Sequence, residues 1–321
     1  MTSSANEVIE AILPLSCAGQ RLDQAVARVI PDYSRARLQQ WIREGRLLVD
    51  GKVLAPKTKV YGGESIRLEA IVAEQDQWQA EEIPLEIVHE DDSLIVINKP
   101  AGLVVHPAAG NREGTLLNAL LHHAPELNKI PRAGIVHRLD KDTTGLMVVA
   151  KTLQAQKSLV EQLQSRSVSR QYRAIVYGVF VSGGTIDLPI GRHPIDRKKM
   201  AVVDGGKEAI THYRLNEKFR DFTLVSVKLE TGRTHQIRVH MAHLKHPLVG
   251  DSVYGGRLRF PKGASERLMT ELRAFNRQAL HAQRLALLHP EHGELIEWSV
   301  ALPQDMQHLI KVLQQENNHG C

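Results

Sequence analysis

The residues from 135 to 151, IVHRLDKDTTGLMVVAK, place a short charged loop between two apolar stretches. Ile135-Val136 precede the loop, and the run from Leu146 to Ala150 follows it. Similar short runs rich in valine and isoleucine recur at 94–97, 174–177, 224–227 and 237–239. Helical stretches are fewer and are expected at 116–123, 154–165 and 265–276. Many short strands with few helices predict an α+β domain built on a central, largely antiparallel mixed β-sheet.

The composition is that of a globular protein without a membrane span or a disulfide framework. The 321 residues are 42% hydrophobic and 24% charged. No apolar run approaches the roughly 20 residues of a transmembrane helix. Cys17 and Cys321 stand near opposite ends, and the first 20 residues lack the basic start of a secretory signal. These features predict a cytoplasmic protein, and the net charge of +5 leans mildly towards an anionic partner.

Charge is distributed unevenly along the first third of the chain. Residues 20–60 hold nine Lys or Arg against four Asp or Glu, whereas residues 61–92 hold one against ten. A basic module followed by an acidic stretch indicates a domain edge. We therefore predict a small basic domain over 18–75, a linker over 76–84 in which Trp78 docks on a neighbour, and a larger domain over 85–315.

Residues 20–70 predict a small α/β module with a basic surface. Apolar residues recur at helical spacing from 22 to 30, and Ser34 is placed to cap a second helix that ends before Gly45. Short strands at 47–49 and 66–68 and a turn at Asp50-Gly51 complete the module. Four arginines are expected on the exposed helix faces: Arg35, Arg37, Arg43 and Arg46. Charge alone leaves open whether they form a solvated face or a nucleic-acid contact.

Three loops of the larger domain are dense in polar and charged residues. They read NKPAGLVVHP at 98–107, HRLDKDTTG at 137–145 and ETGRTHQIRVH at 230–240. Loops held rigidly by strands are common places for catalytic groups, although an ion-pair network that stabilises a turn would look the same. Asp140 and Asp142 are both candidates for a functional carboxylate, and their spacing does not choose between them.

Two other kinds of site are disfavoured by the sequence. His240, His243 and His246 could place metal ligands on one side of a helix, but no cysteine lies nearby. A glycoside hydrolase needs two carboxyl groups at a fixed separation, which Asp140 and Asp142 in a single turn would not readily supply. The chain has no phosphate-binding loop and no dinucleotide fingerprint, so neither a metal nor a nucleotide cofactor is predicted.

The motifs together resemble a known family. HRLDKDTTGLMVVAK, NKPAGLVVHP and LETGRTHQIRVHMAHLKHPLVGDSVYGG are similar to the three motifs of the large-subunit ribosomal RNA pseudouridine synthases. The run RLDQAVARVIPDYSRARLQQWIREGRLLVDGK, completed by VYGGESIRL, resembles an S4-like RNA-binding domain. The resemblance extends over nearly the whole chain. It implies a pseudouridine synthase fold with an active-site cleft, preceded by a small RNA-binding domain.

The resemblance also implies roles for single residues. Asp140 aligns with the catalytic aspartate of the family, which favours it over Asp142. Tyr172 aligns with the tyrosine that packs against the target uracil, and Arg238 with the basic residue that pairs with the aspartate.

Three further positions follow from the same alignment. Arg138 is expected to hold the flipped-out nucleotide, and Leu280 to lie under the base. The family often has an acidic residue just before the tyrosine, whereas this chain has Gln171, which puts that one neighbouring contact in doubt. The four arginines of the basic module become candidates for RNA binding.

The chemistry of the family explains why these side chains are needed. Pseudouridine forms when the bond from uracil N1 to ribose C1′ is replaced by a bond from C5 to C1′. The change involves no oxidation, so no cofactor is expected. An ionised carboxylate can attack C1′ or C6, or remove a proton at C2′, and the sequence leaves these routes open. Arg238 stays charged and is therefore suited to keep Asp140 ionised.

The closest branch of the family modifies uridines in helix 69 of 23S ribosomal RNA. This implies 23S ribosomal RNA or a large ribosomal subunit precursor as the partner of a monomeric enzyme. Basic loops at 192–199 and 257–262 are expected either to grip phosphates or to be plain surface loops. Two alternatives remain: the same chemistry on another ribosomal or transfer RNA uridine, and a ribosome-assembly factor that binds RNA without catalysis.

Overall fold

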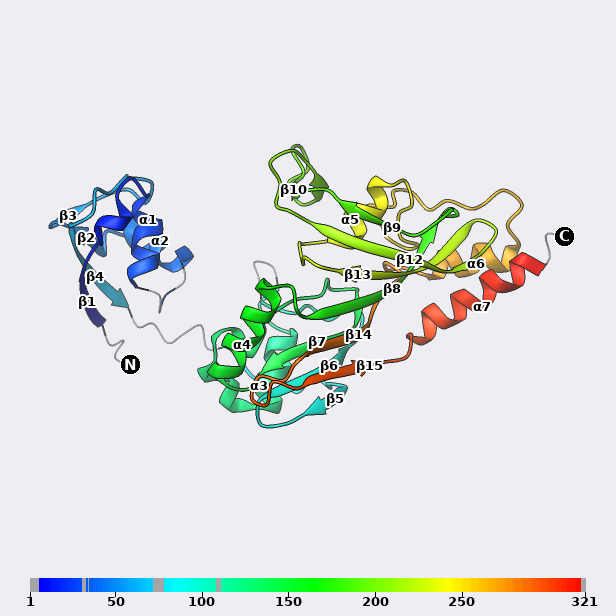
Figure 1. Cartoon of the computed structure of the whole chain (residues 1–321), viewed down its shortest axis with the longest axis horizontal. Helices are drawn as coiled ribbons and strands as arrows, with labels where there is room; N and C mark the ends of the chain where they lie inside the picture. The colour runs from blue at the N-terminus through cyan, green and yellow to red at the C-terminus, as the bar shows by residue number, and fades with distance from the viewer. Residues whose placement is uncertain (1–5, 31–32, 34, 72–77, 108–110, 319–321) are drawn as a thin grey trace. The chain divides into compact units, whose positions relative to one another are not determined.

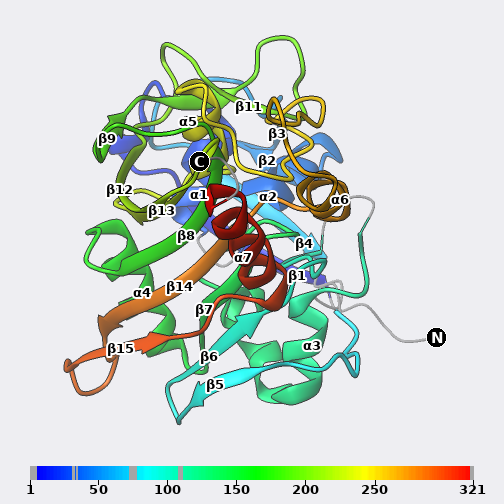
Figure 2. The same cartoon turned by 90° about the vertical axis from the view of Figure 1, so that its right-hand side faces the viewer.

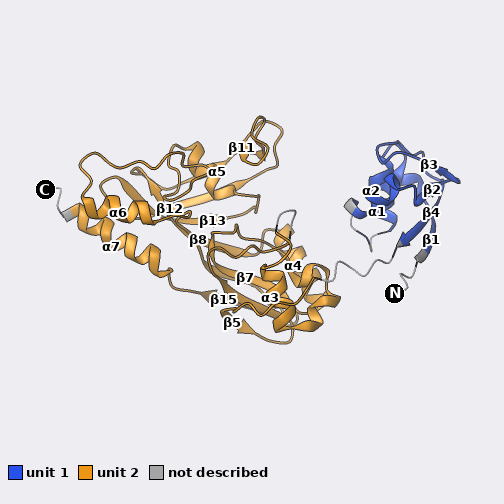
Figure 3. Ribbon diagram, turned by 180° about the vertical axis from the view of Figure 1, so that it is seen from behind, with its two compact units in different colours: residues 1–77 blue, residues 78–321 orange. Residues whose placement is uncertain are grey.

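The computed structural model (Figure 1) divides the chain into two compact units, Met1–Gln77 and Trp78–Cys321 (Figure 3). It describes residues 6–30, 33, 35–71, 78–107 and 111–318. The division falls within the stretch 76–84 that the sequence suggests as a linker. Residues 76 and 77 lie outside the described residues, as does Ser34, the predicted helix cap. Trp78 packs against the largest apolar core of the second unit, and its ring makes a T-shaped contact with the ring of His106.

The first unit pairs two helices with a four-stranded antiparallel sheet. Leu38, Trp41 and Ile42 of the second helix are buried against the first helix and the sheet. The strand order is β1-β4-β2-β3. The two predicted helices and the strands at 47–49 and 66–68 are confirmed, and β1 is an addition. The elements are β1 (Asn6–Ile12), a 3-10 helix (Leu15–Cys17), α1 (Leu22–Val29), α2 (Arg35–Arg43), β2 (Leu47–Val49), β3 (Lys52–Val53) and β4 (Ser65–Ile71).

A buried carboxylate ties the two helices of this unit together. The side chain of Asp23 in α1 is fully buried and accepts hydrogen bonds from Arg21, Arg35 and Gln39. The Arg21 Nε atom lies 2.9 Å from Oδ1, and the Arg35 Nη2 atom 2.6 Å from Oδ2. Burial opposes ionisation, but these donors outweigh it and lower the pKa of Asp23 to about 2. Part of the charge of Arg35 is therefore used inside the unit.

We expect Asp23→Asn to lower the free energy of unfolding of the first unit by about 2–3 kcal/mol at pH 7, because a neutral amide cannot replace the charged acceptor. The folded-state pKa lies below the unfolded value of 3.8, so the stabilisation is present above pH 3.8 and is lost as the pH falls through about 2. Hydrogen exchange of the α1 and α2 amides in the intact chain measures the change. Asp50→Asn, in an exposed turn, is the matched control, and equal exchange in both variants would contradict the assignment.

The second unit is built on a nine-stranded mixed sheet (Figures 1 and 2). The strand order is β5-β6-β7-β14-β8-β13-β12-β9, with β15 paired to β14, and β10 and β11 form a separate hairpin. Within this sheet only β7 and β14 run parallel, as expected of a largely antiparallel mixed sheet. The strands are β5 (Ile87–Glu90), β6 (Leu94–Lys99), β7 (Thr144–Ala150), β8 (Ser169–Tyr177), β9 (Gly184–Asp187), β10 (Ile190–Arg192), β11 (Met200–Val202), β12 (Ile210–Lys218), β13 (Phe222–Leu229), β14 (Leu280–Leu288) and β15 (Leu295–Ser299).

Strands β6 and β7 are apolar on both faces because each face covers a different core. Met147 and Val149 of β7 enter the largest core, whereas Leu146 and Val148 face a second core that includes Leu159 of α4. Side chains alternate between the two faces of a strand, so an unbroken apolar run fits a strand buried on both sides. The strand that follows the charged loop is thus fixed in the interior of the unit.

Three of the helices that cover the sheet begin at capping side chains. The predicted helices at 116–123, 154–165 and 265–276 are confirmed, and their caps are Thr115, Thr152 and Ser265. α6 and α7 pack together against β8 and β13 (Figure 2). The helices of the described residues are α3 (Leu116–His123), α4 (Leu153–Gln164), α5 (Gln236–His243), α6 (Glu266–Ala274) and α7 (Gln304–Asn318), with 3-10 turns at Pro125–Lys129 and Pro131–Gly134.

One predicted element is wrong. The run at 237–239 was expected as a strand, but it lies in the first turn of α5. Ile237, Arg238, Val239 and Met241 are all buried, so the helix is enclosed on several sides and shows no amphipathic spacing. A short apolar run of this kind cannot be assigned to strand or helix by periodicity alone. The consequence is functional, because the helix places Arg238 next to the charged loop.

Candidate active site

A cavity of about 890 Å³ lies among the loops of the second unit. Its wall contains residues from the charged loop, β8, α5 and the start of β14. All five residues to which the sequence assigns a catalytic or substrate-binding role line it: Arg138, Asp140, Tyr172, Arg238 and Leu280. The structure therefore brings together side chains that are distant in the sequence, while their individual roles stay predictions.

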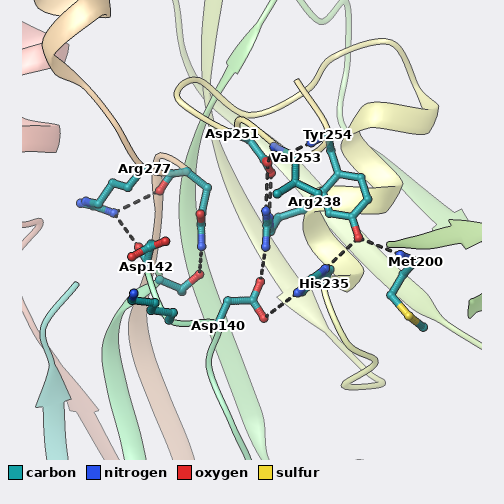
Figure 4. Close-up of polar contacts among 12 residues, drawn as sticks. Asp140, Asp142, Met200, His235, Arg238, Asp251, Val253, Tyr254 and Arg277 are labelled. Carbon is teal, nitrogen blue, oxygen red and sulfur yellow. Dashed lines mark hydrogen bonds and ion pairs between the residues drawn. The ribbon is translucent and has the colours of Figure 1, made fainter. Parts of the chain in front are cut away.

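Asp140 turns its carboxylate towards Arg238 at the wall of this cavity (Figure 4). Its side chain is 16% exposed, and Oδ2 accepts a hydrogen bond of 2.9 Å from Arg238 Nη1. Asp142 is not part of the cavity wall, and its side chain lies apart from Arg238 in Figure 4. The geometry thus distinguishes two carboxylates that sequence spacing leaves equivalent.

A glycine holds the charged loop against β14. Gly145 in β7 pairs with Ala282 in β14 at a positive φ of 111°. A Cβ at this position would lie 2.2 Å from the carbonyl oxygen of Ala282, closer than a non-bonded carbon atom can approach an oxygen. Only glycine permits this approach, which brings the Asp140 loop beside Leu280.

Arg238 lies between two carboxylates. Its Nε and Nη2 atoms donate to both oxygens of Asp251 at 2.7 and 2.9 Å, and Nη1 donates to Asp140. Asp251 is fully buried in its side chain and also accepts from the backbone N–H groups of Val253 and Tyr254. Burial disfavours the arginine charge, but the bonds and charges of Asp251 and Asp140 outweigh it and raise the pKa of Arg238 further above its usual value. The guanidinium is thus a permanent charge in a fixed orientation.

Tyr172 and Leu280 belong to the apolar part of the wall. Tyr172 lies on β8 and is 6% exposed; burial raises the pKa of its hydroxyl, so it is neutral near pH 7. Arg170, two residues earlier on the same face of β8, also lines the cavity, and its buried Nε has no partner in the described residues. Arg138 is exposed at the cavity. A flat apolar surface beside cationic groups is suited to an aromatic base with attached phosphates.

The sequence analysis assigns no role to three residues at the site. Asp251 orients Arg238, and the Tyr254 ring lies 5.0 Å from the guanidinium carbon. The Tyr254 hydroxyl contacts Nδ1 of His235, whose Nε2 lies 3.8 Å from Oδ1 of Asp140. All three lie in the third motif, LETGRTHQIRVHMAHLKHPLVGDSVYGG, and their inclusion in that stretch is the signal that could have found them. The local sequence pattern does not single them out.

A buried lysine fastens the first motif to the charged loop. Lys99, at the end of β6, is 1% exposed, and its Nζ donates to the carbonyl oxygens of Pro100, Leu103 and Lys141 at 2.7 to 2.9 Å. Burial lowers the pKa of Lys99 to about 8, with the charges of Asp142 and Asp140 opposing the shift. At pH 7 the ammonium is largely charged and uses its three N–H groups to hold the loop one residue beyond Asp140.

We expect Lys99→Met to lower the free energy of unfolding by about 1–3 kcal/mol, because three buried carbonyl groups lose their donor. The methionine fills a similar volume, so the loss reports the hydrogen bonds rather than a cavity. Thermal denaturation measures the effect. Lys141→Met, which changes an exposed lysine of the same loop, is the control, and equal melting temperatures for the two variants would contradict the proposed clamp.

The histidines of the third motif do not gather around a metal. No cluster of three or more potential ligands is present among the described residues. His240 contacts Thr211 Oγ1 and the carbonyl oxygen of Leu188, and His246 contacts the carbonyl oxygen of Tyr177. These rings therefore serve packing and hydrogen bonding within the fold.

The predicted RNA-binding arginines of the first unit differ in their surroundings. Arg35 pairs with buried Asp23, and Arg46 lies 3.2 Å from Glu44. Arg37 lies over the ring of Trp41 at 5.3 Å, and exposed Arg43 donates to Gln39. The four side chains remain at or near the surface, and their contact with RNA stays a prediction.

Comparison with known proteins identifies the class of this fold and site. A family model described as RNA pseudouridylate synthase matches residues 93–243, and an S4 domain model matches residues 20–66. Together with the similarity described next, these matches show that the chain belongs to the RNA pseudouridine synthase family and is an enzyme of that class.

Several curated relatives carry the name "Ribosomal large subunit pseudouridine synthase D". The protein from Pseudomonas aeruginosa is 60% identical, with 95% of each chain covered. The protein from Xanthomonas campestris pv. campestris is 55% identical over 96% of this chain and 93% of the relative. The protein from Escherichia coli strain K12 is 58% identical over 93% of this chain and 92% of the relative.

Solved structures support the same fold. The human protein titled RNA Pseudouridylate Synthase Domain Containing 4 is 29% identical, with a TM-score of 0.57 over 71% of this chain and 93% of that chain. The human protein titled RNA Pseudouridylate Synthase Domain Containing 1 is 25% identical, with a TM-score of 0.53 over 73% of this chain and 96% of that chain. In the part of the chain that the structure describes, no helix is long and apolar enough to cross a membrane.

Proposed function

We propose that this enzyme converts uridines to pseudouridine in 23S ribosomal RNA, in the helix 69 stem-loop, and that Asp140 is its catalytic residue. The names of relatives that are 55–60% identical support a large-subunit ribosomal substrate. The motif phrasing and the preceding S4 domain support the helix 69 target. The single observation that carries the role of Asp140 is its contact with Arg238 in the wall of the cavity, beside Tyr172 and Leu280.

The geometry suits a reaction on a base that has left its helix. Extruding a uridine costs a few kcal/mol when it is paired and less when it lies in a loop. Tyr172 offers a ring face on which the uracil can stack, and Arg138 is placed at the cavity to contact the phosphates of the extruded nucleotide. Arg238 donates a hydrogen bond to Asp140 and offsets its negative charge once water is excluded, and both nucleophilic attack and proton removal use the charged carboxylate.

The cellular setting follows from the same substrate. We propose that the enzyme acts as a monomer in the cytoplasm, on 23S ribosomal RNA or a large ribosomal subunit precursor, and so contributes to ribosome biogenesis. The S4 domain and the sequence pI of about 9.2 support an RNA partner. The alternative of a binding factor without catalysis is set aside by the family to which the chain belongs.

We expect the double variant Arg43→Gln, Arg46→Gln to bind ribosomal RNA more weakly and with a shallower salt dependence. Each lost phosphate contact lowers the slope of log affinity against log salt by about 0.7–0.9. These two arginines are preferred to Arg35, because the loss of Arg35 would also remove an ion-pair partner of the buried Asp23 carboxylate. Filter binding over a salt series measures both quantities. Arg284→Gln, an exposed arginine of β14 paired with Glu297, is the control, and an unchanged slope in the double variant would remove these residues from the RNA contact.

Release of hydrogen from C5 of the uracil tests the proposed activity directly. The new bond from C5 to C1′ displaces the C5 hydrogen, so tritium placed at C5 of uridine appears in water as pseudouridine forms. We expect release from 23S ribosomal RNA and from a helix 69 hairpin, and none from the hairpin with its loop uridines replaced by cytidine. Release from 23S RNA without release from the hairpin would overturn the helix 69 target, and release from transfer RNA alone would favour the alternative substrate.

A further inference from the structure

His235 has an unusual backbone for its position beside the catalytic loop. It is the residue before α5 and lies in the left-handed region, with φ 57° and ψ 22°, and its side chain makes no capping bond to the helix. Non-glycine residues adopt this conformation infrequently, and residues that do so cluster at functional sites. Five other non-glycine residues in the described part of the chain also have a positive φ, so the position of the His235 ring beside Asp140 matters more than the backbone conformation itself. The conformation aims the imidazole at Asp140 rather than at the helix.

The hydrogen bonds of Tyr254 favour one position for the ring proton of His235. The Tyr254 oxygen accepts from the Met200 backbone N–H at 2.9 Å and lies 2.7 Å from His235 Nδ1 (Figure 4). If the tyrosine O–H donates to Nδ1, the imidazole proton is on Nε2. The other arrangement would leave that O–H without an acceptor in the described residues and would turn the Nε2 lone pair towards a carboxylate. Both ends of the ring therefore favour the Nε2–H tautomer.

The Nε2–H group faces the oxygen of Asp140 that Arg238 does not use. Nε2 lies 3.8 Å from Oδ1, whereas Arg238 donates to Oδ2 at 2.9 Å. A separation of 3.8 Å is too long for a hydrogen bond, but catalytic hydrogen bonds are often long before substrate binds and shorten in the complex. We propose that His235, fixed in its Nε2–H form by Tyr254, is a positioning residue that hydrogen-bonds Asp140 Oδ1 when RNA occupies the cavity and so sets the direction of the carboxylate.

A neutral donor is the suitable partner for this oxygen. Arg238 already donates a charged hydrogen bond to Oδ2, so Oδ1 needs only a neutral donor to be held in place. The charged groups that face His235 are Asp140, Arg238, Asp251 and Arg138. Burial lowers the pKa of His235, and the charges of Arg238 and Arg138 lower it further. The charges of Asp140 and Asp251 raise it, but by less than the other contributions lower it. The imidazole is thus uncharged at neutral pH and can orient Asp140 without adding charge to the site.

This inference rests on the proposed role of Asp140, and its test separates the two. We expect His235→Asn to lower the single-turnover rate of pseudouridine formation by about 10- to 100-fold, the loss of one hydrogen bond to a charged group, with RNA affinity unchanged. Asparagine tolerates the left-handed region, so the backbone is kept. His235→Gly deletes the ring and relieves the strain, so it should be as slow as His235→Asn and no less stable to heat. His308→Asn, on the exposed face of α7, is the control.

Tyr254→Phe distinguishes a positioning role from a purely structural one. We expect it to be slow on its own and to add no further loss in a His235→Asn background, because the hydroxyl acts through the histidine. In ¹⁵N-histidine-labelled protein, His235 should show the Nε2–H pattern, which Tyr254→Phe should disturb. Full activity of His235→Asn, multiplying losses in the double variant, or an Nδ1–H pattern would each overturn the inference. None of these results touches the role of Asp140, which the variants Asp140→Asn and Asp142→Asn test separately.

Discussion

Asp140→Asn is expected to form no detectable pseudouridine while it binds ribosomal RNA as tightly as the unchanged enzyme. Asparagine has almost the same shape but neither the charge nor the basicity of a carboxylate, so it can neither attack a carbon nor remove a proton. We expect the rate to fall at least ~10³-fold, which corresponds to more than about 4 kcal/mol of activation free energy. Single-turnover measurements at saturating RNA, with affinity measured separately, separate the chemical step from binding.

The charged loop supplies its own matched control for this variant. Asp142→Asn makes the same chemical change two residues away, at a carboxylate that does not line the cavity. We expect it to retain a rate within a few fold of the unchanged enzyme. If Asp140→Asn keeps substantial activity, or if Asp142→Asn is the inactive variant, the assignment of the catalytic carboxylate is wrong.

Arg238→Met is expected to be the most destabilising substitution at the site. It removes the positive charge that lies between Asp140 and Asp251. The Asp251 side chain is completely buried, so water cannot solvate its charge once the guanidinium is gone. Leaving a buried charge without its partner costs about 3–5 kcal/mol. The two backbone N–H groups of Val253 and Tyr254 still bind Asp251, so we place the cost at the lower end. Chemical denaturation measures the free energy of unfolding.

The same variant should also lose activity, because Asp140 then lacks the charged hydrogen-bond donor that holds its carboxylate at the cavity wall. Arg238→Lys keeps the charge but not the paired hydrogen bonds to Asp251, so it should recover part of the activity and little of the stability. Arg284→Met is the matched control, since Arg284 and its partner Glu297 are 47% and 45% exposed and Glu297 can return to water. An Arg238→Met protein as stable as Arg284→Met would refute the account of the Arg238 ion pairs.

The sequence predicts the parts of the fold whose signals are local. The short apolar runs identify β6, β7, β8 and β13, and the capping residues before α3, α4 and α6 mark where those helices begin. The crowded loop containing Asp140 is visible as a stretch of charge between two apolar runs. These features depend on neighbours along the chain, so the sequence alone is enough to find them.

Other features depend on contacts between distant segments and cannot be read locally. Strand β1 is defined by its pairing with β4, about 60 residues later in the chain, and α7 by its packing on α6. The role of Asp251 comes from a guanidinium brought in by α5, and α5 itself looks like a strand in the sequence. Sequence spacing does not distinguish Asp140 from Asp142, because only the tertiary structure shows which carboxylate contacts Arg238. At the level of sequence, the choice of Asp140 therefore depended on the family resemblance.

Mapping pseudouridines in 23S ribosomal RNA tests the central claim most directly. The comparison uses a strain that lacks the gene and three derivatives of that strain. Each derivative carries a plasmid that encodes the unchanged enzyme, Asp140→Asn or Asp142→Asn. We expect the helix 69 pseudouridines to disappear on deletion and to return with the unchanged enzyme and Asp142→Asn but not with Asp140→Asn. Persistence of every helix 69 pseudouridine in the deletion strain, or their return with Asp140→Asn, would contradict the account.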